Sequence, residues 1–449
     1  MQARTYVMKH LFLPLLALLA LVGSAGCRTA HHAPAIPPPD TLTAATPAAT
    51  PLPLPATAVD VALLPDSTAP TEAEADSMEE VDDADLSLPE RLRKLLDNDI
   101  FSRTQVGIYV YDLTADSALF MYNERQCMRP ASNMKLVTAI TALSVLGTQH
   151  EYRTTFGLQG SQADSLWQGS LYVHAGYDPL LDADDLRALT DSLRARGIKA
   201  LGGRVVTDLS MKDDTRMGWG WCWDDDEVPT TPLLYDNRDR FAQALRQALA
   251  EAGIAFDGTV SEGTMPHSLD TLCTRRHSLD AVLLPMMKRS DNSMAESVFY
   301  QIAAHSGKPR ASRKEAAAAV HNLMRQLGLD PSHYQVADGS GLSLYNYVTP
   351  QLLGRLLRYA YAHDAIYRHL LPTLPVAGVD GTLRKRMQGT AAQHNVRAKT
   401  GTVEGVSTLS GYCTAANGHT LCFSIMNQGI RHTSTGRNFQ DRVCRALCR

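Results

Sequence analysis

Strand-like patterns occur at both ends of the folded part of this chain, with most of its length between them. Two such segments come first along the chain and three come last: 105–113, 118–123, 396–403, 407–415 and 419–427. Each is short, rich in β-branched and aromatic residues, and bounded by turn residues. Together with the helical segments beside each group, they predict one α/β (α+β) sandwich whose sheet is completed by both ends of the chain.

Helical periodicity occurs beside and between these strands. The segments that show it are 88–97, 132–147, 184–196, 279–307, 314–327, 350–362 and 438–448. Ser87 can cap the first of them, and Pro89 is tolerated in its first turn. A different texture of short strands, around 171–175 and 203–209, precedes the tryptophan-rich stretch MGWGWCWDDD. We therefore expect residues 151–275 to form an inserted domain.

The first 27 residues are typical of an export signal. A basic start is followed by the uncharged run Leu11–Val22, which is too short to span a bilayer, and then by small residues. The sequence SAGC at 24–27 resembles the bacterial lipoprotein processing site, so lipidation of Cys27 is a hypothesis. The alternative to an export signal in these residues is a buried N-terminal helix.

Residues 28–85 are expected to form a disordered tether. They are rich in proline, alanine and threonine and end in an acidic run from Glu72 to Asp85. Such a segment cannot bury enough apolar surface to fold.

A chain of 449 residues is long enough for two or three domains. We predict one domain from 86–150 and 276–449, interrupted by the insertion.

Charge and cysteine content limit the partners and the chemistry. The formal net charge of −4 does not suggest nucleic acid as a partner. The chain has eight cysteines, so an odd number remains after Cys27 and at least one should be free. Cys413 and Cys422 flank Asn417-Gly418, a strong hairpin signal. A two-residue turn there would place them face to face, either as a disulfide or as two adjacent thiols.

Ser132 and Lys135 are three residues apart and so lie on one face of a predicted helix. A serine hydroxyl is a poor nucleophile unless a base takes its proton. Lysine can be that base when burial or a nearby cation lowers its pKa, and Lys399 could supply the cation. The S-x-x-K pattern alone is weak evidence, because it recurs by chance in chains of this length.

Ser290-Asp291-Asn292 stands in the break between two helical stretches. A hydroxyl and a carboxamide there could relay a proton and hold both a lysine and a substrate amide. Taken alone, the segment is better explained as a turn that caps the following helix.

Lys399-Thr400-Gly401 lies in a predicted strand, where Lys399 and Gly401 face one side and Thr400 the other. A substrate lying beside this strand would meet the cation. Glycine permits close backbone approach, and the N–H of Thr402 could act with that of Ser132 as an oxyanion donor.

The order S-x-x-K, S-D-N and K-T-G is the motif set of penicillin-binding proteins and class A β-lactamases. Further segments carry the same resemblance: RPASNMKLVTAITALSVLG, WGWCWDDD, SDNSMAESVFYQIA, ADGSGLSLYNYVTP and LPVAGVDGTLRKRM. From about 88 to 449 the chain resembles the D-alanyl-D-alanine carboxypeptidase/endopeptidase family of low-molecular-mass class C penicillin-binding proteins. That resemblance implies a penicilloyl-serine-transferase, β-lactamase-like fold with an inserted domain after the first motif.

The resemblance also implies an activity, partners and a location. It implies a penicillin-inhibited serine peptidase of the bacterial periplasm or cell envelope that acts on peptidoglycan stem peptides without metal or cofactor. β-Lactam antibiotics would be covalent inhibitors, and the membrane would be reached only through a lipid on Cys27. The implied catalytic residues are Ser132 as nucleophile, Lys135 as base, Ser290 as proton relay and Asn292 as holder of the substrate amide; the implied substrate-binding residues are Lys399, Thr400, Gly401 and Thr402.

Two departures from the family pattern stand in the insertion. The family's G-x-G-D-P element is AGYDP here, so Tyr177 replaces a glycine. The insertion is also short, which leaves open whether it forms one subdomain or two.

Two further segments have candidate roles. Asp338 and Ser340 of DGSGLS are candidates for shaping the cleft, or belong to a mere connection. The tryptophans of WGWCW are expected in the core of the insertion rather than on a ligand platform.

Two alternative functions share these motifs. A class A β-lactamase needs a glutamate that activates the deacylating water, and no E-x-x-x-N follows the second motif at a comparable place. A non-catalytic wall-binding lipoprotein would be acylated by penicillin without hydrolysing peptide. The intact motif set favours the peptidase over both.

Overall fold

Five strands from the two ends of the chain form one sheet in the computed structural model, which describes residues 86–98, 100–225 and 227–449. The strands are β1 (Gln105–Asp112), β2 (Ser117–Tyr122), β9 (Arg397–Val403), β10 (Val406–Thr414) and β11 (Thr420–Gln428). Their order is β2-β1-β11-β10-β9, and β1 runs antiparallel to β11 with Ile108 opposite Ile425. The expectation that both ends complete one sheet is confirmed.

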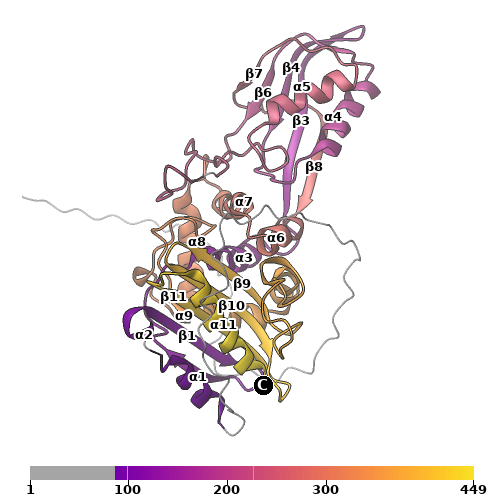
Figure 1. Ribbon diagram of the computed structural model, residues 1–449. Helices are drawn as coiled ribbons and strands as arrows, with labels where there is room; N and C mark the ends of the chain where they lie inside the picture. The colour runs from indigo at the N-terminus through magenta and orange to yellow at the C-terminus, as the bar shows by residue number, and fades with distance from the viewer. Residues whose placement is uncertain (1–85, 99, 226) are drawn as a thin grey trace, which may run out of the picture. The chain divides into compact units, whose positions relative to one another are not determined.

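Helices cover both faces of this sheet. The elements of this part are α1 (Leu88–Leu96), α2 (Ile100–Arg103), a 3-10 turn η1 (Ala131–Asn133), α3 (Met134–Val145), α6 (Leu279–Lys288), α7 (Asn292–Ala304), α8 (Arg313–Gln326), η2 (Pro331–His333), α9 (Pro350–Ala362), α10 (Asp364–Leu370), η3 (Leu371–Thr373), η4 (Gly381–Leu383) and α11 (Thr433–Cys448). Figure 1 shows α11 in front of β10, which it contacts. None of the described helices is long and apolar enough to cross a membrane.

The alternation of side chains along the strands separates two hydrophobic cores. On β1, Ile108 and Val110 face the core that includes residues of α11, whereas Tyr109 and Tyr111 face the core that contains residues of α3, α7 and α9. Gly354 of α9 allows the second core to close, because a Cβ there would lie 2.1 Å from the ring of Tyr109. The sheet is thereby fixed between its two helical layers.

A second sheet is built from residues between Glu151 and Ser278. Its elements are β3 (Glu151–Ala163), β4 (Leu166–His174), α4 (Ala183–Ala195), β5 (Ala200–Leu201), β6 (Val205–Asp208), α5 (Phe241–Glu251), β7 (Val260–Glu262) and β8 (Asp270–Ser278). The sheet has six strands, and one hydrophobic core lies between it and its two helices. The domain boundaries at 150 and 276 stay predictions.

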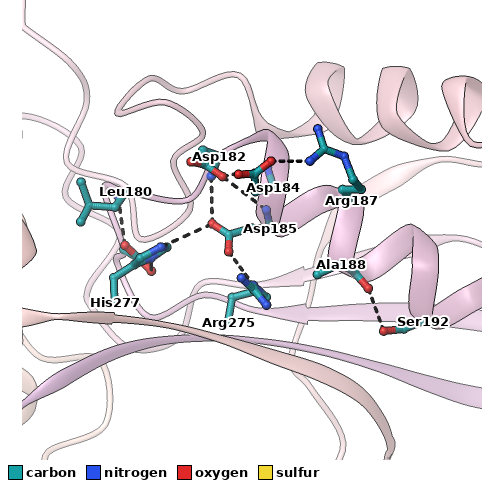
Figure 2. A network of polar contacts seen from close by, with 10 residues as sticks. Leu180, Asp182, Asp184, Asp185, Arg187, Ala188, Ser192, Arg275 and His277 are labelled. Carbon is teal, nitrogen blue, oxygen red and sulfur yellow. Dashed lines mark hydrogen bonds and ion pairs between the residues drawn. The ribbon is translucent and has the colours of Figure 1, made fainter. Parts of the chain in front are cut away.

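A polar network fixes the first helix of this second sheet. The Asp182 carboxylate accepts hydrogen bonds from the N–H groups of Asp184 and Asp185, which caps α4. Asp185 in turn accepts from Arg275 Nε at 2.5 Å, so β8 is tied to the start of α4. Figure 2 shows Asp182, Asp185, Arg275 and His277 in this network. His277 Nε2 lies 3.8 Å from Asp185 Oδ2, and its Nδ1 is hydrogen-bonded to Asp178 at 2.7 Å.

Tyr177, which stands where the family element has a glycine, keeps a backbone conformation that is typical of glycine. Tyr177 has φ +53°, in the left-handed region that glycine adopts freely and that costs another residue about 1–2 kcal/mol. Its ring is buried and stacks against Tyr300 of α7, with ring centroids 5.9 Å apart. The packing of the ring offsets the strain of the backbone.

The pairing expected between Cys413 and Cys422 is wrong. The hairpin closes through the five residues 415–419, with Ala415 N–H bonded to His419 O, instead of a two-residue turn. This shifts the register by one, so Cys413 lies opposite Leu421, and it sends the two thiols to opposite faces of the sheet. None of the described cysteines forms a disulfide, and the Cys448 thiol together with burial raises the pKa of Cys413.

Two sequence expectations concern residues that the structure does not describe. The export signal at 1–27, including Cys27, and the tether at 28–85 lie outside the described residues.

Candidate active site

Ser132 sits in the short 3-10 turn η1 that leads into α3. The turn is held from the sheet by Thr408 of β10, whose hydroxyl donates to Pro130 O at 2.8 Å and accepts from the Asn133 side chain. Ala131 has φ +46°, which bends the backbone sharply before the serine. The nucleophile candidate is therefore positioned by the sheet as well as by its own helix.

Lys135 lies one helical turn after Ser132 and is fully buried. Its Nζ is 3.0 Å from Ser132 Oγ, 2.6 Å from Asn292 Oδ1 and 2.8 Å from the backbone oxygen of Ser340. Two of these three partners are carbonyl oxygens, which only accept hydrogen bonds. A neutral amine has two N–H groups and one lone pair, so this set of partners leaves the lone pair for the serine hydroxyl.

Burial lowers the pKa of Lys135 to about 8, although the nearby carboxylates of Asp338 and Glu296 oppose the shift. Lysine is usually protonated at neutral pH, with a pKa of about 10.4. The lowered value makes the neutral amine accessible, which is the state that can take a proton from Ser132.

The second motif occupies the break between α6 and α7. Ser290 has φ +63°, and its Oγ accepts a hydrogen bond from Lys399 Nζ at 2.8 Å. Asp291 caps α7 by accepting from Met294 N–H at 2.9 Å, as the helix-cap interpretation expects. Asn292, the first residue of α7, reaches Lys135. The segment thus caps a helix and also brings Ser290 to Lys399 and Asn292 to Lys135.

Lys399 belongs to β9, which is an edge strand of the sheet. Lys399 Nζ donates to Ser290 Oγ and to Thr400 O, and burial together with Lys135 lowers the pKa of Lys399 well below its usual range. The hydroxyl of Thr400 points elsewhere, to that of Thr382 at 2.8 Å. The alternation expected from the sequence, with Thr400 on the other side, is confirmed.

Gly401 is the residue of β9 that lies against the nucleophile turn, the 3-10 turn η1 that carries Ser132. A Cβ at this position would lie 2.2 Å from Thr408 Oγ1, 2.8 Å from Pro130 O and 3.0 Å from Ser132 N. Thr402 faces Ser407 one step before the Glu404-Gly405 turn, at a non-hydrogen-bonded position, so its N–H points away from β10. The N–H groups of Ser132 and Thr402 are therefore both available beside Gly401.

The DGSGLS segment contributes the third contact of Lys135 through Ser340. The buried Asp338 carboxylate fixes the loop by accepting from Gly341 N–H at 2.8 Å and from Ser343 N–H at 2.7 Å. Glu296 of α7 accepts from Ser340 N–H at 2.9 Å, and burial with the nearby Asp338 raises the pKa of Glu296 to about 8. The loop is a structural part of the site and not a mere connection.

The expectation that the WGWCW tryptophans pack in the core of the insertion is wrong. Trp223 is 90% exposed and Trp219 is 40% exposed. Trp221 instead donates its indole N–H to Asp338 at 2.9 Å. The stretch adopts no helix or strand that could direct the rings inward, and two of its rings contact the DGSGLS segment and its neighbour Tyr345.

Two carboxylates beside the site were not singled out from the sequence. Glu227 accepts a hydrogen bond from Asn292 Nδ2 at 2.5 Å, and Glu296 supports Ser340 as described above. Helical spacing could have revealed Glu296, because it follows Asn292 by four residues on α7. No local signal marks Glu227, which comes from an irregular segment of the insertion.

The geometry brings the three motifs to one place, and comparison with known proteins identifies the family. The chain matches the D-Ala-D-Ala carboxypeptidase 3 (S13) family over residues 88–234 and 229–448. It belongs to this family.

Individual S13 relatives and a solved structure agree with this match. D-alanyl-D-alanine carboxypeptidase DacB of Haemophilus influenzae is 27% identical over 418 residues, which covers 74% of this chain and 86% of the relative. Carboxypeptidase DacB of Mycolicibacterium smegmatis is 30% identical over 373 residues, covering 75% and 79%. The crystal structure of penicillin binding protein 4 from H. influenzae has a TM-score of 0.71 at 24% identity, covering 79% and 98%.

These findings confirm three expectations from the sequence. The S13 family is the one that the motifs resemble, the fold is of the penicillin-binding, β-lactamase-like class, and the chain is by family a serine-type D-Ala-D-Ala carboxypeptidase, a hydrolase. The roles of individual residues stay predictions.

Proposed function

We propose that this S13 member removes the terminal D-alanine from peptidoglycan stem peptides through an acyl-enzyme on Ser132. The observation that carries the proposal is the contact of Ser132 Oγ with a fully buried lysine amine, 3.0 Å away. Neutral Lys135 takes the hydroxyl proton as Oγ attacks the carbonyl carbon of the penultimate D-alanine. The N–H groups of Ser132 and Thr402 stabilise the oxyanion that forms.

Ser290 and Lys399 serve the other half of the reaction. The tetrahedral intermediate collapses to an ester on Ser132 while the leaving D-alanine amine takes a proton relayed by Ser290. Water then hydrolyses the ester and releases the shortened peptide. Thr400 and Thr402, which share one side of β9, receive the terminal carboxylate, while the buried Lys399 on the other side supplies positive charge. The arriving negative charge favours the protonated form of Lys399.

The same site explains inhibition by β-lactams, which would acylate Ser132 and leave an ester that hydrolyses slowly. The H. influenzae penicillin binding protein 4 has been solved in complex with a β-lactam.

We further propose that the chain is exported and anchored by a lipid on Cys27, with residues 28–85 as the tether between that anchor and the catalytic part.

The decisive experiment follows free D-alanine after incubation of the 86–449 fragment with a pentapeptide that ends in D-Ala-D-Ala. Release that stops on addition of penicillin supports the carboxypeptidase. The Ser132→Ala variant should lose both D-alanine release and penicillin labelling, and release that persisted in it would remove Ser132 from the mechanism. Penicillin labelling without release would favour a non-catalytic receptor, or an enzyme that requires intact cross-linked wall.

A further inference from the structure

The carboxylate of Glu227 enters the candidate site from the insertion and contacts Asn292. Glu227 Oε1 accepts from Asn292 Nδ2 at 2.5 Å, while Asn292 Oδ1 accepts from Lys135 Nζ at 2.6 Å. The Asn292 amide is thus held at both ends, between a group that only accepts hydrogen bonds and a group that donates one. We infer that Glu227 is a positioning residue that fixes the orientation of the Asn292 amide and, through it, the lone pair of Lys135.

The inference depends on the asymmetry of a carboxamide. If the Asn292 amide turned over, its NH₂ would face the Lys135 amine and its oxygen would face the Glu227 carboxylate. The hydrogen bond with Glu227 would be lost, because two acceptors would then meet, and the neutral Lys135 amine could only accept from the Asn292 NH₂ with its lone pair. A glutamate at this place therefore selects the orientation in which an oxygen faces Lys135.

That orientation decides where the free lone pair of Lys135 points. With Asn292 Oδ1 and Ser340 O occupying its two N–H groups, the neutral amine can accept only from Ser132. If an NH₂ faced Lys135, the amine would accept from Asn292 and could no longer take the serine proton. Glu227 acts here through Asn292, and nothing in its role requires contact with substrate.

The segment that carries Glu227 is anchored on both sides. Before it, Cys222 N–H donates to Asp225 at 2.6 Å, and after it, the Thr230 hydroxyl donates to Thr215 O at 2.7 Å. Asn237 of the same stretch donates to Asp291 at 3.1 Å. The insertion thus holds two adjacent residues of the second motif, and such support keeps a site residue in one geometry.

The electrostatic effect of Glu227 on Lys135 gives the test a direction. The carboxylates that raise the pKa of Lys135 against the effect of burial are Asp338, Glu296, Asp291 and Glu227, and Lys399 lies near it with the opposite charge effect. Removing the charge of Glu227 without opening the site should therefore lower the pKa of Lys135. A variant that merely loosened the site would admit water and raise that pKa.

The test compares Glu227→Gln with Glu251→Gln, the same change at an exposed position on α5. We expect Glu227→Gln to lower the penicillin acylation rate roughly ten- to hundredfold, part of what a positioned base contributes. The lower limb of its pH profile should move to lower pH, and the unfolding temperature should stay unchanged. Glu251→Gln should match the wild type in all three measurements.

A double-mutant cycle separates positioning from general damage. In the Asn292→Ala background, Glu227→Gln should change the acylation rate less than about twofold, because the amide that it orients is absent. An equal fall in both backgrounds would overturn the inference, as would an unchanged pH profile. Normal acylation with loss of deacylation alone would assign Glu227 to the hydrolytic step and also overturn it.

The inference rests on the proposed role of Ser132 and Lys135 but can fail separately. A wild-type protein that is acylated by penicillin yet releases no D-alanine would contradict the proposed carboxypeptidase, while the acylation data would still decide the role of Glu227.

Discussion

Lys135 combines complete burial with three hydrogen-bond partners, and the two properties act in opposite directions on its proton. Burial disfavours the ammonium, whereas two carbonyl oxygens and the neighbouring carboxylates favour it. The balance leaves its pKa near 8, close to the pH at which a base works best. In the proposed mechanism the site therefore needs no histidine as its base.

This balance predicts a pH dependence. In the proposed mechanism the neutral amine is the active form, so the acylation rate should rise as the pH increases through about 8 and fall tenfold for each pH unit well below that value. Stopped-flow acylation by a penicillin between pH 5 and 10 measures it. A rate that stayed flat across this range would exclude Lys135 as the base.

Gly401 predicts a second effect at the scale of one residue. A methyl group at this position would overlap Thr408 Oγ1 and press on Ser132 N. Gly401→Ala should therefore push β9 away from the nucleophile turn, lower the free energy of unfolding by about 1–3 kcal/mol and slow acylation. Thermal unfolding and acylation rates test both effects. Glu404→Ala, an exposed change just after the same strand, is the control, and an alanine variant with unaltered acylation would contradict the close approach.

At the scale of elements, the loop at 338–343 depends on one buried carboxylate. Asp338 accepts from two backbone N–H groups of the loop and from the side chains of Trp221 and Asn346. Asp338→Asn leaves one oxygen where two were used, so the free energy of unfolding should fall by about 2–4 kcal/mol. Displacement of Ser340 O from Lys135 should also slow acylation.

Chemical denaturation and acylation rates of this variant are the measurements. Asp364→Asn removes an exposed carboxylate that pairs with Arg368 and should cost at most about 1 kcal/mol. If Asp338→Asn were no more destabilised than this control, the loop would not depend on Asp338.

The hairpin β10–β11 shows where reading elements from sequence fails. The two strands were predicted within one residue of their bounds, because their apolar runs are strong. Their register was not, since Asn417 accepts from His419 N–H inside a five-residue loop and does not form a two-residue turn. A single residue of loop length decides which face each thiol occupies.

A prediction about thiols follows from this register. Peptides that contain Cys413 and Cys422 should remain unlinked in non-reducing mass mapping, because the sheet separates the two sulfurs. A 413–422 link would show that the register differs from the one described. A link between Cys413 and Cys448 would not contradict this register, since both thiols lie in the same hydrophobic core.

The whole molecule was predictable to different depths in its two sheets. The sheet that carries the motifs was found because its strands are apolar and lie near both ends of the chain. In the second sheet, β8 reads DTLCTRRHS and is mostly half-exposed, and β3 contains an exposed polar half, so neither shows a clean alternation. The same limit applies to Glu227, because its contact with Asn292 exists only after the insertion has folded against the motifs.

The distribution of the site over the chain predicts how truncation acts. Every residue assigned to the reaction, including the anchored segment around Glu227, lies between 132 and 402, and the sheet that supports them begins at Gln105. The 86–449 fragment should therefore release D-alanine from a soluble pentapeptide at the same kcat/KM as the full chain. Parallel assays of the two proteins with penicillin-titrated active-site concentrations make the comparison. A fragment that was acylated normally but released D-alanine more slowly would mean that residues before 86 take part in catalysis, whereas equal rates on the soluble peptide confine any effect of those residues to location.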